Sequence, residues 1–342
     1  YQENRSFLSS EQVITFTDLD GRLLALKPDV TLSIAKTAQP APGETLRYYY
    51  HENVYRPSAE SHTFQEISQM GLEMLGAVGE AQVQQAVRLA AQSLAQLGAA
   101  WVLEVSHMGY LFGLFDALGV PENARPGLLE KLREKNAHEL RRAAQAAGLD
   151  AAGAAALTGL LELSGSCEET LTKAESACRN ERMRTAAAEL RALAKTLEAS
   201  GGAVRLDLSL AGEMEYYNGL VFQGYLQGLP RPLLKGGRYD LLMQKFTPGA
   251  GAIGFAVYLD ELDRLSAPLP PVQKNSTDRV MLNVRRDSPS ASCSAACSFA
   301  AGVPTLTTRK MPSSRRTTAF CWSGPAASCK IPAAVFRQQS AA

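Results

Sequence analysis

The sequence contains no apolar run near the roughly 18 residues that a membrane-spanning helix needs, and no signal-peptide pattern opens it. Cysteine is scarce: two of the six, Cys167 and Cys178, lie in the body of the chain and four lie within 293–329. Their spacing matches no zinc motif, and no histidine accompanies the last four. These absences argue against a membrane protein and a metal site, and they predict a reduced, cytoplasmic chain.

Acidic side chains are almost absent from one end of the chain. Residues 281–342 hold eight Lys/Arg and a single acid, Asp287, whereas the other residues hold 27 basic and 33 acidic groups. A body with net negative charge lacks the electrostatic footprint of a nucleic-acid-binding protein, so we expect no nucleic-acid partner. The basic tail, 271–342, has no sustained period, so we interpret it either as a disordered segment or as the product of a shifted reading frame.

The rest of the chain has an ordinary globular composition. Hydrophobic residues make up 46% and charged residues 20%, and 342 residues are enough for two or three domains. From 111 to 200 the sequence is rich in Ala, Leu, Glu, Lys and Arg, which predicts a block of helices. Strand patterns return in VRLDLSL (204–210), where apolar and polar residues alternate. Because the chain opens at Tyr1 and not at a methionine, we expect its natural N-terminus to lie upstream.

The segment ISQMGLEML (67–75) predicts a strand whose two faces differ in chemistry. One face is mainly apolar, and the other carries Gln69 and Glu73 on either side of Gly71. Burying an amide and a carboxylate is unfavourable unless partners satisfy them, and a glycine leaves room for another group to approach. Two interpretations stay open: a sheet with one solvated face, or the floor of a site that binds a small polar ligand.

Four segments, in this order, resemble the catalytic core of class II histidyl-tRNA synthetases. They are LALKPDVTLSIAKTA; YYYHENVYRPS with FQEISQMGLEMLG; EYYNGLVF with KGGRYDLL; and GAIGFAVYLDEL. The similarity covers about residues 16–110 and 201–265. It implies an α+β fold, a class II synthetase-like antiparallel sheet flanked by helices. In this reading 1–110 and 201–270 form the core, and 111–200 forms a helical insertion.

The resemblance also implies a histidine-binding role for six residues: Asp29, Thr31, Gln69, Glu73, Tyr216 and Tyr217. The first two match the partners of the ligand's ammonium, the next two fall where a synthetase reads its substrate, and the tyrosines match the ring that closes over it. The residue types suit this task, because carboxylates attract an ammonium and orient an imidazole through its ring nitrogens. The resemblance thus favours the ligand-binding interpretation of the strand.

Catalysis by a synthetase also requires cations beside the triphosphate, and here the sequence departs from the family. Arg56 of the second motif remains, as a vestige, but Ser58 stands where the family has an acid. Gly212 stands where the family has a catalytic arginine, and Asp260-Glu261 replaces the Glu-Arg that ends the third motif. An anion in place of a cation is strongly unfavourable next to a triphosphate. We therefore expect no catalytic residue and no cofactor.

This profile is similar to that of the regulatory subunits of ATP phosphoribosyltransferase, paralogues that keep the synthetase core without aminoacylation. The resemblance implies a chain without catalytic groups of its own, which partners a short-form catalytic subunit in a hetero-oligomer and also self-dimerises. Its role would lie in the first step of histidine biosynthesis and in feedback inhibition by L-histidine. Whether histidine binds in the chain's own pocket or at the subunit boundary stays open.

Two other interpretations are available. One is an active histidyl-tRNA synthetase that performs ATP-dependent aminoacylation, which the lost catalytic residues disfavour. The other is a free-standing histidine sensor, or a kinase-regulating relative, with different partners. An adenylation assay separates the first from a regulatory subunit, and co-purification of a short-form phosphoribosyltransferase separates the second.

Overall fold

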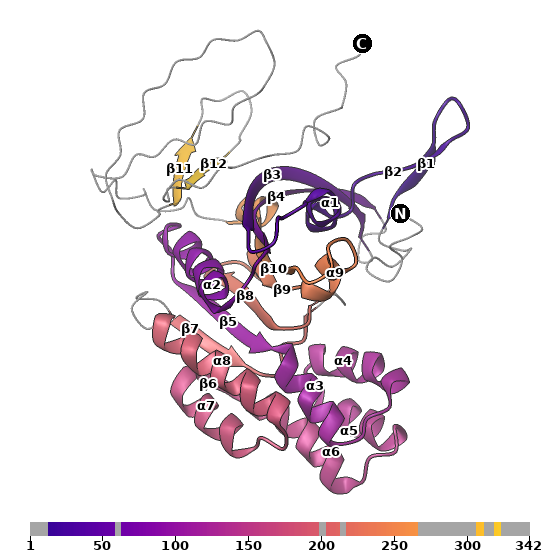
Figure 1. The fold of residues 1–342 in the computed structure, drawn as a ribbon, viewed down its shortest axis with the longest axis vertical. Coiled ribbons are helices and arrows are strands. Elements are labelled where there is room, and N and C mark those ends of the chain that lie inside the picture. Colours follow the sequence, from indigo (N-terminus) through magenta and orange to yellow (C-terminus); the bar gives the residue numbers. More distant parts are fainter. Residues whose placement is uncertain are drawn as a thin grey trace.

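The structure, a computed structural model, describes residues 13–58, 63–197, 203–212 and 217–265, together with two short strands at 306–310 and 318–322. The described part consists of a large sheet with helices packed on it and a separate cluster of helices at one end (Figure 1). Within this part, no helix has both the length and the apolar composition needed to cross a membrane.

The sheet has eight strands in the order β3-β4-β10-β9-β8-β5-β7-β6. Their bounds are β3 (Thr45–Pro57), β4 (Phe64–Gly76), β5 (Trp101–His107), β6 (Ser164–Ser166), β7 (Ala203–Asp207), β8 (Leu220–Leu226), β9 (Leu234–Arg238) and β10 (Gly251–Tyr258). Only β5 and β7 run parallel; every other neighbouring pair is antiparallel. The predicted α+β fold with a mainly antiparallel sheet is therefore confirmed.

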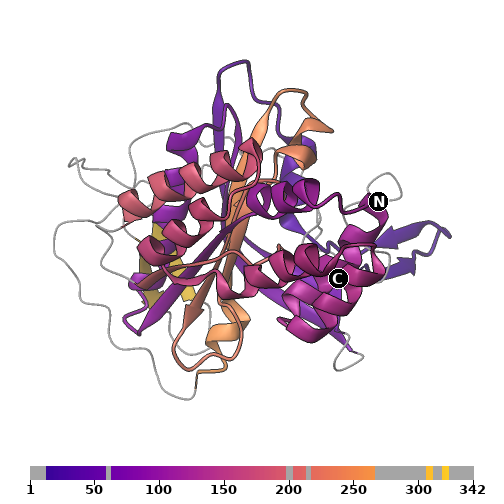
Figure 2. The same cartoon turned by 90° about the horizontal axis from the view of Figure 1, so that it is seen from below.

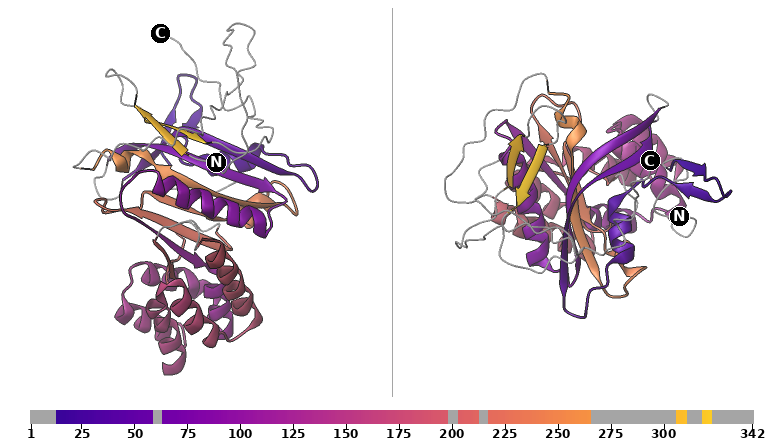
Figure 3. Two further views of the ribbon diagram at one scale, coloured as in Figure 1. Left: turned by 90° about the vertical axis from the view of Figure 1, so that its left-hand side faces the viewer. Right: turned by 90° about the horizontal axis from the view of Figure 1, so that it is seen from above.

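Strands β3 and β4 form a long hairpin that curves across the top of the sheet (Figure 3). They pair over 13 residues each, and β4 also pairs with β10 along its second half. This double pairing places β4 inside the sheet. Its polar face is covered as well: Gln69 and Glu73 are 3% and 1% exposed, and the hydroxyls of Thr31 and Tyr239 donate to Glu73. A solvated polar face for this strand, one of the two interpretations above, is wrong.

Four helices accompany the sheet. They are α1 (Val30–Thr37), α2 (Glu80–Ala95), α9 (Asp240–Gln244) and α10 (Leu259–Leu262). Helix α2 covers one face, where its Leu94 lies against Gly224 of β8; Phe222 and Phe255, whose ring centroids are 6.4 Å apart, occupy the same face. Because side chains alternate along a strand, Gln223, Gly254 and Glu73 face the other side of the sheet, toward α1 and α9.

The second group of helices follows β5. It comprises α3 (Met108–Ala117), η3 (Glu122–Ala124), α4 (Arg125–Arg133), α5 (Ala137–Ala146), α6 (Ala151–Thr158), η4 (Gly159–Glu162), α7 (Cys167–Ser176) and α8 (Glu181–Leu197). Seen from below, these helices lie in front of the sheet (Figure 2). Apart from the first three residues of α3, they fall within 111–200, the segment expected to be a helical insertion, with the short strand β6 among them. The division into domains itself stays a prediction.

Two polar side chains, His107 and Lys135, contribute to joining the helical group to the sheet. His107, the last residue of β5, caps α3: its Nδ1 accepts the Gly109 N–H at 3.0 Å while its Nε2 lies 3.0 Å from the Glu189 carboxylate. Lys135, between α4 and α5, places Nζ 2.6 Å from the buried carboxylate of Asp207 at the end of β7. The helical group is thus anchored to β5, after which it begins, and to β7, to which the chain returns.

Two hairpins stand outside the main sheet. Strands β1 (Thr15–Thr17) and β2 (Leu23–Ala25) pair only with each other among the described strands and project from the body (Figure 1). Strands β11 (Leu306–Lys310) and β12 (Thr318–Trp322) form the other pair. The rest of 271–342, and with it our interpretation of that tail, lies outside the described residues.

Candidate functional site

The face of the sheet opposite α2 carries a pocket whose floor is built from glycines. Gly71 of β4 and Gly254 of β10 both lie on this face, and neither position tolerates a side chain. A Cβ at Gly71 would overlap the phenol of Tyr50, and one at Gly254 would overlap the carboxylate of Glu73. The glycines are therefore required here because functional side chains lie flat over the backbone.

Glu73 is the most deeply buried acid of the pocket, with 1% of its surface exposed. Its Oε1 accepts the Thr31 hydroxyl at 2.6 Å, and its Oε2 accepts the Tyr239 hydroxyl at 2.5 Å. Burial raises the pKa of Glu73 to about 8, although these two hydroxyl donors act in the opposite direction. Glu73 therefore retains its proton at neutral pH.

Asp29 provides a second buried carboxyl at the start of α1. As the N-cap of that helix, it accepts the Leu32 N–H at 2.7 Å through Oδ1. Burial raises the pKa of Asp29, and the positive charge of Arg56 partly offsets this. The Arg56 guanidinium lies 3.5 Å from Asp29 Oδ2 and donates through Nε to the Pro28 carbonyl at 2.8 Å. Arg56 thus holds the segment that leads into α1.

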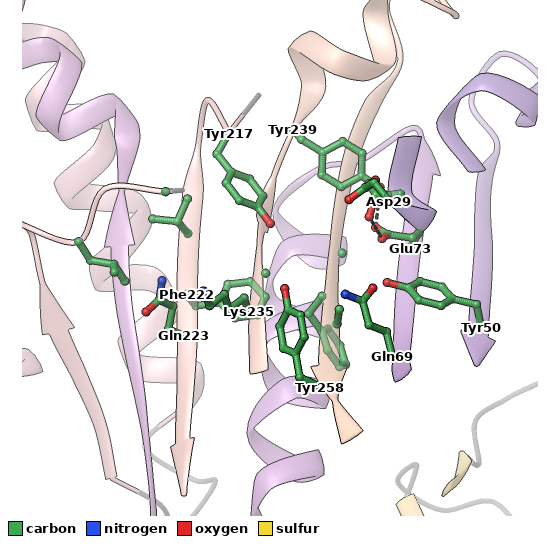
Figure 4. A pocket seen from close by; sticks show the side chains of 18 of the residues that line it. Asp29, Tyr50, Gln69, Glu73, Tyr217, Phe222, Gln223, Lys235, Tyr239 and Tyr258 are labelled. Atoms are coloured by element: carbon green, nitrogen blue, oxygen red, sulfur yellow. Dashed lines mark hydrogen bonds between the residues drawn. The ribbon is translucent and has the colours of Figure 1, made fainter. Parts of the chain in front are cut away.

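Aromatic side chains form the walls, and Figure 4 shows them converging on the space above the floor. Tyr217 lies over Gly237, where an added Cβ would meet its ring at 2.7 Å. Tyr258 pairs in register with Gln69, whose amide is also buried. Burial raises the pKa of Tyr50 well above its ordinary value, and the nearby Glu73 carboxyl adds to the effect.

The far side of the pocket has a different character. Lys235 of β9 pairs in register with Gln223 of β8, and both line the pocket on the side away from Asp29 and Glu73 (Figure 4). The Tyr225 hydroxyl donates to Gln223 Oε1 at 3.0 Å. The pocket encloses about 700 Å³, including the solvent at its open mouth. It can therefore hold a small polar molecule between an acidic end and a basic end.

The structure brings most of the predicted site residues together. Asp29, Thr31, Gln69, Glu73 and Tyr217 all line this pocket, as does the vestigial Arg56. Tyr216 lies outside the described residues. The sequence reasoning missed five further polar side chains of the lining: Tyr50, Gln223, Lys235, Tyr239 and Tyr258. Tyr239 and Lys235 stand on either side of a glycine pair in KGGRYDLL, and such a pair is a usable signal for close backbone approach.

Two of the positions that depart from the synthetase pattern, Gly212 and Asp260, contact other parts of this chain. Gly212 lies against Tyr217, and a Cβ there would meet the ring at 2.7 Å. Asp260 lies outside the pocket lining and accepts the Ser68 N–H at 2.8 Å. Among the described lining residues, only Arg56 and Lys235 carry positive charge. No group of three His, Cys, Asp or Glu side chains in the described ranges is close enough to hold a metal ion.

Known proteins with sequences similar to this chain share one family. A sequence model of the histidyl-tRNA synthetase family matches residues 3–262. The ATP phosphoribosyltransferase regulatory subunit of Bacillus licheniformis is 31% identical over 290 residues, which is 82% of this chain and 73% of the relative. The chain spans 64% to 73% of the length of the curated relatives that it matches, several of which carry the same name.

Solved structures of related proteins have the same fold as this chain. A structure from Bacillus halodurans, described as an ATP phosphoribosyltransferase regulatory subunit/histidyl-tRNA synthetase, superposes with a TM-score of 0.66 at 31% identity and covers 76% of this chain and 70% of that one. A chain of the Thermotoga maritima ATP phosphoribosyl transferase (HisG:HisZ) complex superposes with a TM-score of 0.59 at 19% identity, over 71% of this chain and 84% of that one, and supports the fold alone. The class II synthetase-like fold is thereby confirmed. The chain belongs to the histidyl-tRNA synthetase-like family of ATP phosphoribosyltransferase regulatory subunits.

Proposed function

We propose that this chain is a non-catalytic regulatory subunit of an ATP phosphoribosyltransferase and that its pocket binds L-histidine. The observation that carries the proposal is the uneven chemistry of one pocket. Its amino-acid side retains two buried carboxyls, a buried amide and several tyrosines, while two positions that supply catalytic cations in a synthetase are Gly212 and Glu261.

The retained side suits histidine in particular. Asp29, beside the Thr31 hydroxyl, accepts hydrogen bonds from the ligand's ammonium. Glu73 and Gln69 face the imidazole, whose two ring nitrogens need one donor and one acceptor when the ring is neutral. A protonated Glu73 supplies the donor to one ring nitrogen, and the side-chain oxygen of Gln69 accepts the N–H of the other. The rings of Tyr217 and Tyr258 add apolar area around the ligand.

The nucleotide side does not suit adenylate formation. A triphosphate requires several positive charges that are already in position before the reaction. Arg56 is held by the Pro28 carbonyl and by Asp29, and Gly212 lies against the Tyr217 ring, where no arginine side chain fits without displacing it. We therefore infer that the chain contributes no catalytic groups.

Regulation follows from linkage between sites. We infer that the chain assembles with a short-form catalytic subunit, and with a second copy of itself, in a cytoplasmic hetero-oligomer. Histidine in the pocket inhibits the first step of histidine biosynthesis only to the extent that it binds one arrangement of the assembly better than another. A coupling of about 1–3 kcal/mol corresponds to a 5- to 150-fold effect on affinity.

The test is a reconstitution of the two chains. Full-length protein is mixed with a short-form ATP phosphoribosyltransferase, and phosphoribosyl-ATP formation is followed with and without L-histidine. Activity that requires both chains and falls when histidine is added supports the proposal. ATP–pyrophosphate exchange that depends on histidine would instead identify a synthetase. Histidine binding without any effect on the catalytic chain would identify a histidine sensor with another partner.

A further inference from the structure

The Tyr50 side chain reaches from β3 over the part of the pocket floor that lies nearest to Asp29. Tyr50 is 8% exposed and pairs in register with Gly71 of β4. A Cβ on Gly71 would overlap both Cζ and Oη of Tyr50, so the hydroxyl end of the ring lies directly above that glycine. Because side chains two positions apart share one face of a strand, Gln69 and Glu73 stand on either side of it. Figure 4 shows the hydroxyl directed into the pocket.

The Tyr50 hydroxyl is available to a ligand. It makes no hydrogen bond to another residue in the described part of the chain, whereas the hydroxyls of Thr31 and Tyr239 both donate to Glu73. Burial, together with the nearby acids Glu73 and Asp29, raises the pKa of Tyr50 well above its ordinary value, so the phenol stays neutral. Its oxygen therefore offers lone pairs to a donor in the pocket.

Packing ties Tyr50 to the start of α1. Its ring belongs to a small buried cluster with Val30 and Val54. Val30 stands between Asp29 and Thr31 in the sequence, and these are the two residues assigned to the ligand's ammonium in the proposed function. A ring held by such packing keeps its hydroxyl in place before a ligand binds, which lowers the entropic cost of the contact.

An amino-acid ammonium presents three N–H donors, and α1 offers it two acceptors. Asp29 uses Oδ1 for the Leu32 N–H at 2.7 Å, which leaves Oδ2, 3.5 Å from the Arg56 guanidinium. Thr31 gives its hydroxyl hydrogen to Glu73 at 2.6 Å, which leaves the lone pairs of Oγ1. The third N–H requires an acceptor from another element of the fold.

We propose that the Tyr50 hydroxyl accepts this third N–H, so that β3 completes the ammonium site begun by α1 and the pocket selects a ligand with a primary amine. The proposal rests on histidine binding at this site and adds a residue that determines which chemical form of the ligand is recognised.

The experiment measures ligand binding to the full chain by calorimetry, with L-histidine and with imidazolepropionate, which has the same ring and carboxylate but no amine. The variants are Tyr50→Phe and, as a matched control, Tyr55→Phe. Tyr55 lies on the same strand outside the pocket lining, and its hydroxyl donates to Glu66 at 3.0 Å.

We expect Tyr50→Phe to weaken histidine binding by at least about tenfold, the scale of one hydrogen bond to a charged group. The same variant should bind imidazolepropionate as the unmodified protein does, because that ligand brings no N–H to the hydroxyl. Tyr55→Phe should leave both affinities unchanged.

Thermal unfolding without ligand separates a ligand contact from a structural role. Tyr50→Phe keeps the ring above Gly71 and removes a hydroxyl that bonds to no other described residue, so its Tm should not fall below that of the unmodified protein.

Two outcomes overturn the inference: a Tyr50→Phe protein that binds histidine as tightly as the unmodified protein, or one that weakens histidine and imidazolepropionate by the same factor. Both leave the proposed function intact, because the unmodified protein still binds histidine. An unmodified protein that binds no histidine instead removes histidine binding in this pocket from the proposed function, and the role of Tyr50 with it.

Discussion

The motif positions on the amino-acid side of the pocket and those that a synthetase uses for the nucleotide differ in their surroundings. On the amino-acid side, Glu73 is buried with a complete set of hydroxyl donors, and Asp29 both caps a helix and faces the pocket. On the nucleotide side, Asp260 is committed to a backbone amide of β4 and Gly212 is packed beneath a ring. Glu73 and Asp29 face the pocket, whereas Asp260 and Gly212 contact other residues of the protein.

Under the proposed function, recognition and activation of an amino acid are separable in this fold. Recognition depends on side chains that lie on the central strands and that the sheet itself orients. Activation depends on cations at the periphery, and these positions tolerate replacement without disturbing the sheet. A chain that keeps the first and loses the second retains an affinity that a partner subunit can use.

The largest expected effect comes from closing the floor of the amino-acid side. In a Gly254→Ala variant the new methyl group overlaps the Glu73 carboxylate and displaces it from Thr31 and Tyr239. We expect histidine affinity to fall by more than about 100-fold and stability to fall by about 1–3 kcal/mol from overpacking. Calorimetry and urea denaturation measure the two effects.

A matched glycine provides the control. Gly127 lies in α4, where an added Cβ meets nothing within 4 Å. Gly127→Ala should leave histidine binding unchanged and stabilise the chain by up to about 1 kcal/mol, because alanine favours a helix. If Gly254→Ala binds histidine as tightly as Gly127→Ala does, Glu73 is not part of the ligand site.

A Glu73→Gln variant tests whether the protonation of Glu73 makes the free energy of unfolding depend on pH. The folded pKa of Glu73, about 8, is above its ordinary value of 4.5. The folded state therefore binds the extra proton between these limits, and its stability falls as pH rises from about 4.5 to 8. In a Glu73→Gln variant this contribution disappears, so the difference in unfolding free energy should change by roughly 1.4 kcal/mol per pH unit in that range.

Urea denaturation of both proteins at pH 5.5, 7 and 8.5 measures this slope. The variant gains stability relative to the parent as pH rises, and the gain levels off above pH 8. A constant difference across the three pH values would instead show that Glu73 is ionised throughout and carries no proton at neutral pH.

Much of the fold was predictable because it depends on local pattern and order. The strand at 67–75 has one mainly apolar face, the helical block has a uniform composition, and the four motif segments occur in a recognisable order. The sequence reasoning left open whether the polar face of β4 was solvated. That depends on what packs over this face, namely Thr31 of α1 and the Tyr239 side chain, and these contacts join segments distant in sequence that no local pattern reports.

The candidate site was predicted in part for the same reason. Residues inside matched motifs, such as Gln69 and Asp29, were found by resemblance. Tyr50 and Lys235 were missed, because their place in the pocket follows from cross-strand register: Tyr50 lies opposite Gly71, and Lys235 lies opposite Ala256. Register between strands distant in sequence is set by the folded sheet and not by either strand alone.

A Tyr239→Phe variant has a smaller expected effect. It removes one of the two hydroxyl donors to Glu73 while keeping the ring that packs beneath α9. Because that hydrogen bond lowers the pKa of Glu73, its loss should move the pH dependence of stability to higher pH. A net cost of about 0.5–1.5 kcal/mol is typical for one such bond. A Tyr239→Phe protein with the pH profile of the parent would show that the hydroxyl does not act on Glu73.

The smallest effect is expected on the nucleotide side, for substitutions of Asp260. Asp260 accepts the Ser68 N–H at 2.8 Å, and Ser68 directly precedes Gln69 in β4. An Asp260→Ala variant loses this hydrogen bond and should destabilise the chain by about 1 kcal/mol, whereas Asp260→Asn keeps an acceptor oxygen and should be nearly neutral. Neither variant should change histidine affinity, since Asp260 lies outside the pocket lining. If Asp260→Ala weakens histidine binding while Asp260→Asn does not, the two halves are coupled through β4, and the residue that lies outside the pocket still positions Gln69 within it.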